Sequence, residues 1–304
     1  MKTLASKVGG EEAFMQIGTH IHDIKMSFGL EIFPGKKLER FVYLWQIYAG
    51  QIYLVDSGVA GAGDLILSDV RANGHDPSQI AALIMTHAHP DHIGGALGVQ
   101  RATGCVVAAH EAEKPWIEDT ELQYRQRPVP GFHSIVEGSV RVDRVLHDGD
   151  SLELKDGSAL MAVHTPGHAK GHIALLYDVD KALFCGDCVP LRGGMPIYDD
   201  AIASVKSIKR LRDIKGLELL LSSWDVPRHG RRIYEVMDEA LAYIQDIHRA
   251  VRQAKAELGP ADVPVIAGQV CRKLGLPETA LNPPFFKTVE AHLKVSDCRD
   301  LLSL

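Results

Sequence analysis

The sequence contains no apolar stretch long enough to cross a membrane and no excess of positive charge. No apolar run approaches the roughly 20 residues that a transmembrane helix needs, so we expect no membrane partner. The formal net charge is −6 in 304 residues. Because nucleic-acid binding usually requires a basic face, this balance argues against a nucleic-acid partner.

Cysteine is also scarce, and its five copies are an odd number scattered along the chain. This distribution favours reduced thiols over a disulfide framework. The opening residues, MKTLASKVGGEEAF, include no apolar segment followed by a cleavage-like site, so we expect no secretory signal. Together these features predict a cytoplasmic protein. The cysteines are Cys105, Cys185, Cys188, Cys271 and Cys298.

What is present is an ordinary globular composition, 46% hydrophobic and 24% charged. From about residue 40 to about residue 225, short apolar runs alternate with turns and helical stretches. After about residue 230 only amphipathic helical patterns follow. This organisation predicts an α/β body over residues 1–230 and a helical extension over residues 231–304.

Turn residues indicate where several strands meet. A tight turn at Ala49-Gly50 separates VYLWQIY from QIYLVDSG, which predicts a hairpin. We expect a second hairpin around Asp148-Gly149 and a third around residues 178–181. The apolar run IAALIMTH predicts a strand that leads directly into a cluster of histidines.

This cluster, THAHPDHIGG, concentrates metal-binding side chains in one turn. His87 and His89 are two residues apart on extended chain, so their rings can point to the same side. Pro90 suits the start of a helix, which would bring Asp91 and His92 into a turn beside them. Imidazole and carboxylate together suit zinc, iron or manganese better than calcium or magnesium.

Two further strand ends offer the other ligands that such a site needs. His168 follows a strand in HTPGHAKGH, and Asp187 follows another in LFCGDCV. Active-site residues at strand ends converge readily in sheet proteins, and an aspartate can bridge two ions through its two oxygens. His172, four residues after His168, could hydrogen-bond a ligand or the substrate.

Four motifs, VDSG, THAHPDHIGG, HTPGH and FCGD, occur in the order and at the approximate spacing of the metallo-β-lactamase superfamily. The chain resembles this superfamily over about residues 40 to 225. The resemblance implies an α/β fold, a four-layer αββα sandwich with a dinuclear metal site along one edge. The helical extension would follow this sandwich at its C-terminal end.

The resemblance also implies ligands for each ion. Two zinc ions are the expected cofactor, with iron or manganese as alternatives. Asp56 of VDSG resembles the buried family aspartate that braces the metal loop without binding metal. The implied ligands are His87, His89 and His168 for the first ion, Asp91 and His92 for the second, and Asp187 as a bridge.

The chain departs from the family pattern at one ligand. The family closes its second site with a histidine after the last strand, in a stretch like LLPGHG, where this chain has LLLSSWDVPRHG. Aligning the strand ends puts Trp224 at that position. Asp225 could supply an oxygen ligand, His229 could reach back from beyond the strand, or nothing replaces the histidine. We assign Asp225 as the ligand.

These features predict a metal-dependent hydrolase that acts on an ester, thioester, lactone or amide in a small molecule. Two bound ions lower the pKa of water from near 16 towards about 7, which makes hydroxide available at neutral pH. They also polarise the oxygen on which charge develops. Asp91 would orient the nucleophile, or act as a general base if the second ion is absent. The helical extension looks most like that of hydroxyacylglutathione hydrolases.

Other chemistry is open to the same residues. A single iron held by His87, His168 and Asp187 would resemble persulfide dioxygenases, which are oxidoreductases. The segment CGDC also matches a redox C-x-x-C motif. The implied role of Asp187 as a metal ligand explains this segment better than a redox dithiol does. The sequence leaves open the natural substrate and the oligomeric state, a homodimer included.

Overall fold

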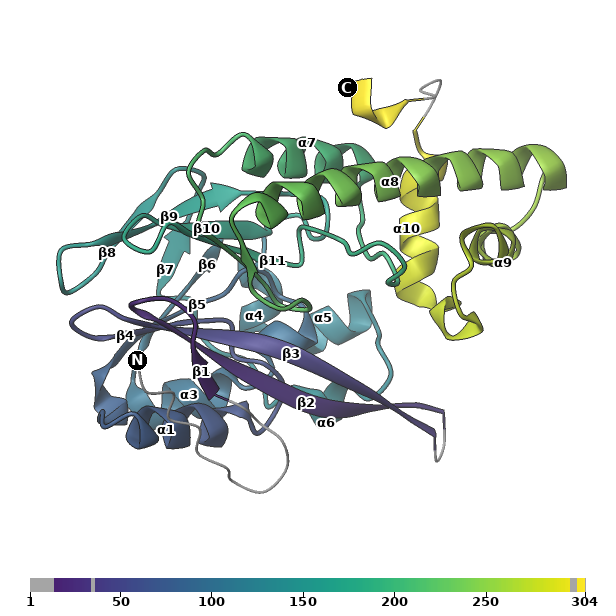
Figure 1. Ribbon diagram of the computed structural model, residues 1–304. Coiled ribbons are helices and arrows are strands. Elements are labelled where there is room, and N and C mark those ends of the chain that lie inside the picture. Colours follow the sequence, from purple (N-terminus) through teal and green to yellow (C-terminus); the bar gives the residue numbers. More distant parts are fainter. Residues whose placement is uncertain (1–13, 34–35, 296–299, 304) are drawn as a thin grey trace. The chain divides into compact units, whose positions relative to one another are not determined.

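A computed structural model describes residues 14–33, 36–295 and 300–303 of the protein (Figure 1). The chain divides into two compact units that interleave along the sequence. Unit 1 takes the described part of residues 1–163 together with residues 173–186 and 219–227. Unit 2 takes residues 164–172, 187–218 and the described part of 228–304. The division into residues 1–230 and 231–304 stays a prediction.

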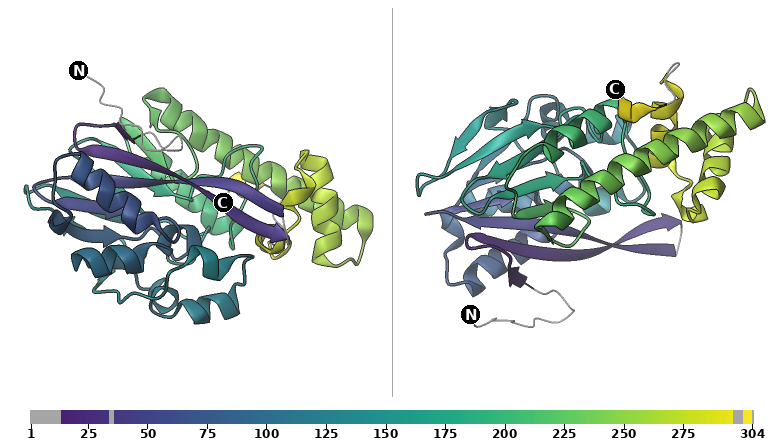
Figure 2. Two further views of the ribbon diagram at one scale, coloured as in Figure 1. Left: turned by 90° about the horizontal axis from the view of Figure 1, so that it is seen from below. Right: turned by 45° about the horizontal axis from the view of Figure 1, so that its top comes forward.

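Unit 1 is built on a mixed sheet. Its strands, in spatial order, are β1 (Phe14–Gln16), β2 (Ile21–Phe33), β3 (Lys36–Tyr48), β4 (Ile52–Val55), β5 (Ile80–Ile84), β6 (Val106–His110) and β7 (Arg144–Leu146). Strands β1 to β4 pair antiparallel, and β4 to β7 pair parallel. The long antiparallel ribbon of β2 and β3 is visible in both views of Figure 2.

The alternation of side chains along these strands gives the sheet two buried faces. Successive residues of a strand point to opposite sides. In β3, Val42 and Leu44 pack in a core with helices α1 (Ala62–Ala72) and α3 (Ala96–Thr103). Trp45, on the other face, packs in a second core with the second sheet. Unit 1 therefore layers helices, a sheet and a second sheet.

The second sheet completes the core of unit 1. Its strands include, in spatial order, β12 (Leu219–Ser222), β11 (Ala182–Gly186), β10 (Ile173–Tyr177), β9 (Ala159–His164) and β8 (Ser151–Glu153). Strand β11 pairs parallel with β12 and antiparallel with β10. Phe184 of β11 meets the indole of Trp45 edge-on, with ring centroids 6.2 Å apart. The shorter helices of unit 1 are η1 (Pro77–Gln79), α2 (Pro90–Ile93), α4 (Lys114–Glu118), α5 (Thr120–Gln126) and α6 (Phe132–Ile135).

Unit 2 is mainly helical. The 28-residue helix α8 (Arg231–Leu258) contacts α7 (Ala201–Arg212), α9 (Val263–Leu274) and α10 (Pro283–Leu293). Its buried side chains recur every three or four residues, which is the spacing of one helical face. Within the described parts of the chain, no helix has both the length and the apolar character that a bilayer crossing requires. The remaining elements are β13 (Arg228–His229), η2 (Glu278–Ala280) and η3 (Leu301–Ser303).

The structure confirms most of the predicted elements and corrects one. The turn at Ala49-Gly50 joins β3 to β4, with Gly50 at φ 71°, and β10 and β11 form the hairpin expected around residues 178–181. The predicted hairpin around Asp148-Gly149 is wrong. Strand β7 pairs with β6 in the first sheet, whereas β8 pairs with β9 in the second. A turn signal shows where the chain reverses but not which strands pair.

Candidate metal centre

The histidine cluster runs from the carboxyl end of β5 into the short helix α2. Pro90 occupies the first turn of α2, as predicted. The two glycines that follow are required by close packing. A Cβ on Gly94 would lie 2.0 Å from the carbonyl oxygen of Ile135, and one on Gly95 would lie 2.6 Å from that of Ser57. The loop can therefore pack this tightly only with glycine at both positions.

Asp56 holds this loop through three hydrogen bonds. Its Oδ1 accepts from the backbone N–H of Thr86 at 2.7 Å. Its Oδ2 accepts from the Thr86 hydroxyl at 2.8 Å and from Nδ1 of His92 at 2.8 Å. A carboxylate only accepts, so His92 carries a proton on Nδ1, and the lone pair of its neutral ring is on Nε2. These bonds fit the bracing role expected of Asp56.

The same network determines the proton position on His87. The Thr86 hydroxyl gives its single proton to Asp56, so it accepts from Nδ1–H of His87 at 3.0 Å. The lone pair of the neutral His87 ring is then on Nε2, which lies 3.0 Å from Nδ1 of His89. Two nitrogens on one tetrahedral zinc would be roughly 3.3 Å apart, so this spacing suits a shared metal.

Asp91 and His92 present a second pair of donor atoms. Oδ2 of Asp91 lies 3.5 Å from Nε2 of His92. The His92 side chain is fully buried, and that of Asp91 is 19% exposed. When His92 is neutral, neither atom has a proton to share with the other. A cation is the group that both atoms would bind.

Two buried side chains hold the backbone of Ala88, between the first two histidines, and sequence analysis missed both. Oε2 of Glu113 accepts from the backbone N–H of Ala88 at 2.8 Å. Nε2 of Gln123, on α5, donates to the carbonyl oxygen of Ala88. Glu113 is 4% exposed and Gln123 is fully buried. Both contacts are to backbone, so the sequence carries no motif for them. They fix the relative orientation of His87 and His89.

In unit 2, His168 follows a turn that requires glycine. Gly167 has φ 138°, and a Cβ there would lie 2.3 Å from Oγ of Ser204. Nδ1 of His168 donates to the carbonyl oxygen of Ile197 at 2.6 Å, so its neutral ring has the lone pair on Nε2. That nitrogen lies 3.4 Å from Oδ2 of Asp187. Two acceptor atoms again lie side by side.

His172 is buried and holds the backbone of Asp187. Its Nε2 accepts from the N–H of Asp187 at 3.2 Å, and its Nδ1–H donates to the Thr165 hydroxyl at 2.8 Å. His172 therefore bonds the backbone of one candidate ligand, and a bond from His172 to a substrate stays a prediction. Burial raises the pKa of the adjacent Cys188 thiol to about 12, which disfavours a redox role because the thiolate is the reactive form.

The residues after β12 lie where the family histidine was expected. Trp224 is half-buried, with its ring centroid 6.4 Å from that of Phe28 and 6.2 Å from that of Phe41. Asp225 is 9% exposed, and its Oδ1 accepts from the backbone N–H of Val226 at 2.9 Å. His229 is exposed on β13 in unit 2. Trp224 thus packs as an aromatic residue, and the assignment of Asp225 as a ligand stays a prediction.

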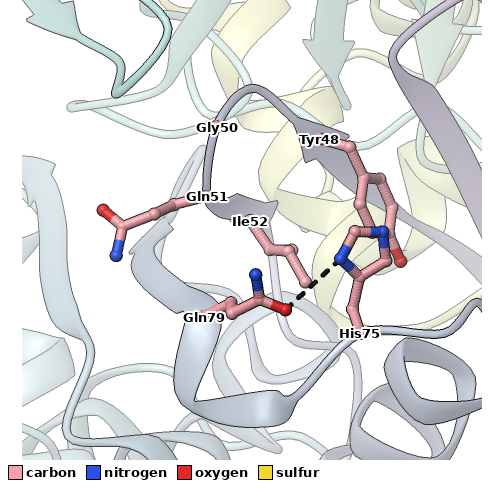
Figure 3. A pocket seen from close by; sticks show the side chains of 6 residues that line it. All are labelled: Tyr48, Gly50, Gln51, Ile52, His75 and Gln79. Atoms are coloured by element: carbon pink, nitrogen blue, oxygen red, sulfur yellow. Dashed lines mark hydrogen bonds between the residues drawn. The ribbon is translucent and has the colours of Figure 1, made fainter.

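A surface hollow of unit 1 shares no residue with these donor groups (Figure 3). It has a volume of about 160 Å³. Nδ1 of His75 lies 3.3 Å from Oε1 of Gln79, and the ring of Tyr48 lies beside that of His75 with centroids 4.9 Å apart. We do not assign it to the candidate centre. It is lined by Tyr48, Gly50, Gln51, Ile52, His75 and Gln79.

The donor groups of each unit fit a divalent metal. Buried imidazoles whose second nitrogen donates to a carboxylate, hydroxyl or carbonyl are typical of metal ligands. Unit 1 brings four predicted ligands together on one loop, and unit 2 brings two together. That all of them bind in one centre stays a prediction. They are His87, His89, Asp91 and His92 in unit 1, and His168 and Asp187 in unit 2.

A family model described as the metallo-beta-lactamase superfamily matches residues 38–268. The chain belongs to this superfamily. Membership of the metallo-beta-lactamase superfamily supports divalent-metal binding and metal-dependent hydrolysis in general terms. It confirms the resemblance carried by the four motifs, although it does not name the metal or the substrate.

Individual members of the superfamily are similar over most of the chain. A hydroxyacylglutathione hydrolase from Methylococcus capsulatus is 28% identical over 257 residues, which are 84% of this chain and 86% of that protein. A beta-lactamase-like protein 2 homolog from Caenorhabditis elegans is 25% identical over 201 residues, which are 66% of this chain and 58% of that protein. The chain thus spans little more than half of that second relative.

Solved structures confirm the fold class. The crystal structure of a beta-lactamase domain protein from Burkholderia ambifaria matches with a TM-score of 0.67 at 19% identity, covering 95% of this chain and 90% of that one. The predicted α/β sandwich with a C-terminal helical extension is therefore correct.

Proposed function

We propose that this superfamily member hydrolyses an ester, thioester, lactone or amide bond in a small molecule with the help of bound metal. The proton positions on His87, His92 and His168 carry the proposal. Each ring donates through Nδ1 to an acceptor in its own unit, so each neutral ring offers Nε2 to a metal. Histidines that were merely solvated would not need three rings oriented in this way.

Six ligands of one dinuclear centre are assigned from the family resemblance, and Asp225 is assigned at the position where this chain departs from it. Zinc is the proposed metal because it accepts imidazole and carboxylate ligands together. Iron and manganese are the alternatives. The assigned ligands are His87, His89 and His168 for the first ion, Asp91, His92 and Asp225 for the second, and Asp187 as the bridge.

Several residues around this proposed centre have distinct roles. A metal held by these residues would lower the pKa of water towards about 7 and would supply a positive charge for the substrate carbonyl. Asp91, which is partly exposed, is the candidate to orient the attacking water and hold its proton. Asp56 keeps His92 in the tautomer that offers Nε2. The bonds to Ala88 keep His87 and His89 aligned.

The substrate class is proposed from similarity. The relative from Methylococcus capsulatus is named a hydroxyacylglutathione hydrolase, and we therefore propose a thioester ahead of the other three bond types. We also propose a cytoplasmic location. The thiols of Cys105, Cys185, Cys188 and Cys271 are buried, in keeping with a reducing compartment, and Cys298 lies outside the described residues.

Metal analysis combined with a substrate panel tests this function. Protein purified without added metal is analysed for its elements and assayed on thioesters, lactones, activated esters and phosphodiesters. We expect about two zinc ions per chain and thioester hydrolysis that is lost in His87→Ala. The control is His133→Ala, because His133 is exposed on α6. Protein that binds no metal and hydrolyses none of the panel would refute the proposal.

The same experiment distinguishes hydrolysis from the main alternative, an iron-dependent oxidation. About one iron per chain, together with oxygen uptake on a persulfide substrate, would indicate the persulfide dioxygenase reaction instead. This alternative is favoured by Trp224, which packs against Phe28 and Phe41 at the family histidine position. An aromatic side chain supplies no ligand there, and a site with one ion needs none.

Asp225→Ala tests the seventh ligand. If Asp225 binds the second ion, the substitution lowers the metal content towards about one ion per chain. An unchanged metal content would reject this assignment while leaving the other six ligands in place.

A further inference from the structure

The backbone that orients His168 is held by the C-terminal helices of its own unit. The segment that follows Asp187 runs to the start of α7 and supplies the Ile197 carbonyl that accepts from His168. Tyr243 of α8 donates from its hydroxyl to the carbonyl oxygen of Gly194 at 2.7 Å. Helix α10 bonds the same segment at residues next to Ile197.

Thr288 of α10 bonds the backbone on both sides of Ile197. Its hydroxyl oxygen accepts from the N–H of Tyr198 at 3.1 Å. Its single proton has its shortest acceptor in the carbonyl oxygen of Pro196, at 3.0 Å. Thr288 is fully buried, so these bonds have no water to replace them. One side chain thereby fixes the two peptides that determine where the Ile197 carbonyl points.

A second contact joins the same segment to the same helix. The Tyr198 hydroxyl lies 2.6 Å from Nε2 of His292, and Nδ1 of His292 lies 3.2 Å from Nδ1 of His248 on α8. These three side chains are buried. This contact anchors the Tyr198 ring, whereas Thr288 holds the peptides beside Ile197. The two contacts can therefore be removed separately.

We propose that Thr288 is a positioning residue that sets the metal affinity of His168 through the Ile197 carbonyl, an inference that rests on the proposed function. A hydrogen bond to the second nitrogen of a metal-binding histidine fixes the ring's orientation and its tautomer. Losing such a partner typically lowers metal affinity 10- to 100-fold. The C-terminal helices would then tune the metal site without supplying a ligand.

Cobalt(II) titration of full-length variants tests this role. Thr288→Val keeps the shape of the side chain but removes both hydrogen bonds, and we expect its cobalt affinity to fall about 10- to 100-fold with an altered visible spectrum. Thr288→Ser keeps the hydroxyl and should retain affinity. Tyr198→Phe removes the bond to His292 only, so it should bind cobalt like the unaltered protein. Thr279→Val is the surface control, since Thr279 is exposed.

Two outcomes would overturn the inference. Unchanged affinity in Thr288→Val, or equal losses in Thr288→Val and Tyr198→Phe, would mean that α10 only stabilises the unit. If Thr288→Val fails to fold, hydrogen exchange in the unaltered protein decides. Metal should increase the protection of the Tyr198 amide, because the coupling between the two is reciprocal, and an unchanged rate refutes the inference.

His168→Ala separates this inference from the proposed function. The proposed function requires that His168→Ala lose the first ion. If His168→Ala binds cobalt like the unaltered protein, the ligand assignment fails, whatever Thr288→Val does. If His168→Ala loses cobalt and Thr288→Val does not, only the role of Thr288 is refuted.

Discussion

Asp56 adopts a backbone conformation that few residues with a side chain tolerate. Its φ is 61°, in the left-handed region where aspartate and asparagine are among the less disfavoured residues. The conformation persists because the carboxylate satisfies three buried donors, two on Thr86 and one on His92. A residue without a polar side chain would retain the strain and lose all three bonds.

The loss of stability caused by a substitution of Asp56 should therefore depend on how many hydrogen-bond acceptors the new side chain keeps. Asp56→Ala leaves three buried donors unsatisfied, and we expect a loss of about 3 kcal/mol or more in the free energy of unfolding. Asp56→Asn keeps one acceptor oxygen and tolerates the left-handed backbone, so its loss should be smaller. Urea unfolding of the metal-free proteins measures both. Asp64→Ala, at an exposed site on α1, is the control, and equal losses in the two Asp56 variants would contradict this reading.

A second prediction concerns Gln123, which bonds the backbone between the candidate ligands His87 and His89. Gln123→Ala removes the donor to the Ala88 carbonyl, so His87 and His89 lose part of their fixed orientation. We expect zinc affinity to fall about 10- to 100-fold, as for other partners of metal ligands. Competition with a chromophoric chelator measures this change.

The matched control lies on the same helix. Gln126 of α5 is exposed and bonds the indole of Trp116 at 2.7 Å. Gln126→Ala should leave the zinc affinity unchanged. Equal effects in the two variants would show that α5 acts on the loop as a whole and that Gln123 has no special role.

A single functional residue could be predicted from the sequence only where it belongs to a recognisable motif. Spacing in THAHPDHIGG indicated the candidate ligands, and the resemblance of VDSG to a family motif indicated the bracing role of Asp56. Glu113 and Gln123 were missed because each bonds the backbone of Ala88, and a backbone partner imposes no residue type at a fixed distance along the chain. Such partners can be found only from the folded arrangement.

Among the elements, α10 carries a histidine whose protonation opposes folding. Burial, together with the nearby His248, lowers the pKa of His292 to about 3. In the unfolded chain the ordinary value is about 6.5. Between these values the unfolded chain binds a proton that the folded chain excludes. The contribution of His292 to stability is therefore present above pH 6.5 and is lost as the pH falls towards 3.

His292→Gln should flatten the pH dependence of unfolding. One proton contributes at most about 1.4 kcal/mol per pH unit, so the unaltered protein should lose more stability than the variant between pH 6.5 and pH 4.5. Urea unfolding in the presence of a chelator, at both pH values, measures the difference. His133→Gln, at an exposed histidine, should behave like the unaltered protein. Parallel curves for His292→Gln and the unaltered protein would reject the assignment.

Element boundaries were predictable where periodicity and turns agreed, and strand pairing was not. The helices after residue 230 follow an apolar spacing of three and four residues, and α8 and α9 lie where that spacing indicated. The turn at Asp148-Gly149 instead takes the chain from the first sheet to the second. Both sheets offer buried faces to short apolar strands, so the local pattern is the same for either.

At the scale of the whole molecule, metal should stabilise the fold by an amount that rises with the logarithm of its concentration relative to its Kd. A metal that binds only the folded protein adds about 2.7 kcal/mol to the free energy of unfolding at a concentration 100 times its Kd. We expect the melting temperature to rise with zinc and to fall with a chelator, as measured by calorimetry. His168→Ala should show a smaller rise. An equal rise in both proteins would exclude His168 from the site.

No pattern in the sequence indicates that the two units interleave. Its change in pattern near residue 230 reflects the end of the strands, whereas the segment 187–218 already belongs with the later helices. Helix α7 contacts α8, and Nζ of Lys209 donates to the carbonyl oxygen of Leu302 at 2.6 Å. Contacts over such separations leave no local signal.

Because the units interleave, we expect that shortening the protein at residue 230 would destabilise what is left. A truncated chain would keep α7 but lose α8, so apolar side chains such as Val205, Ile208 and Leu211 would lose part of their cover. Because Tyr243 and Thr288 bond the segment between Asp187 and α7, a change in the C-terminal helices would also act on the loops that carry His168 and Asp187.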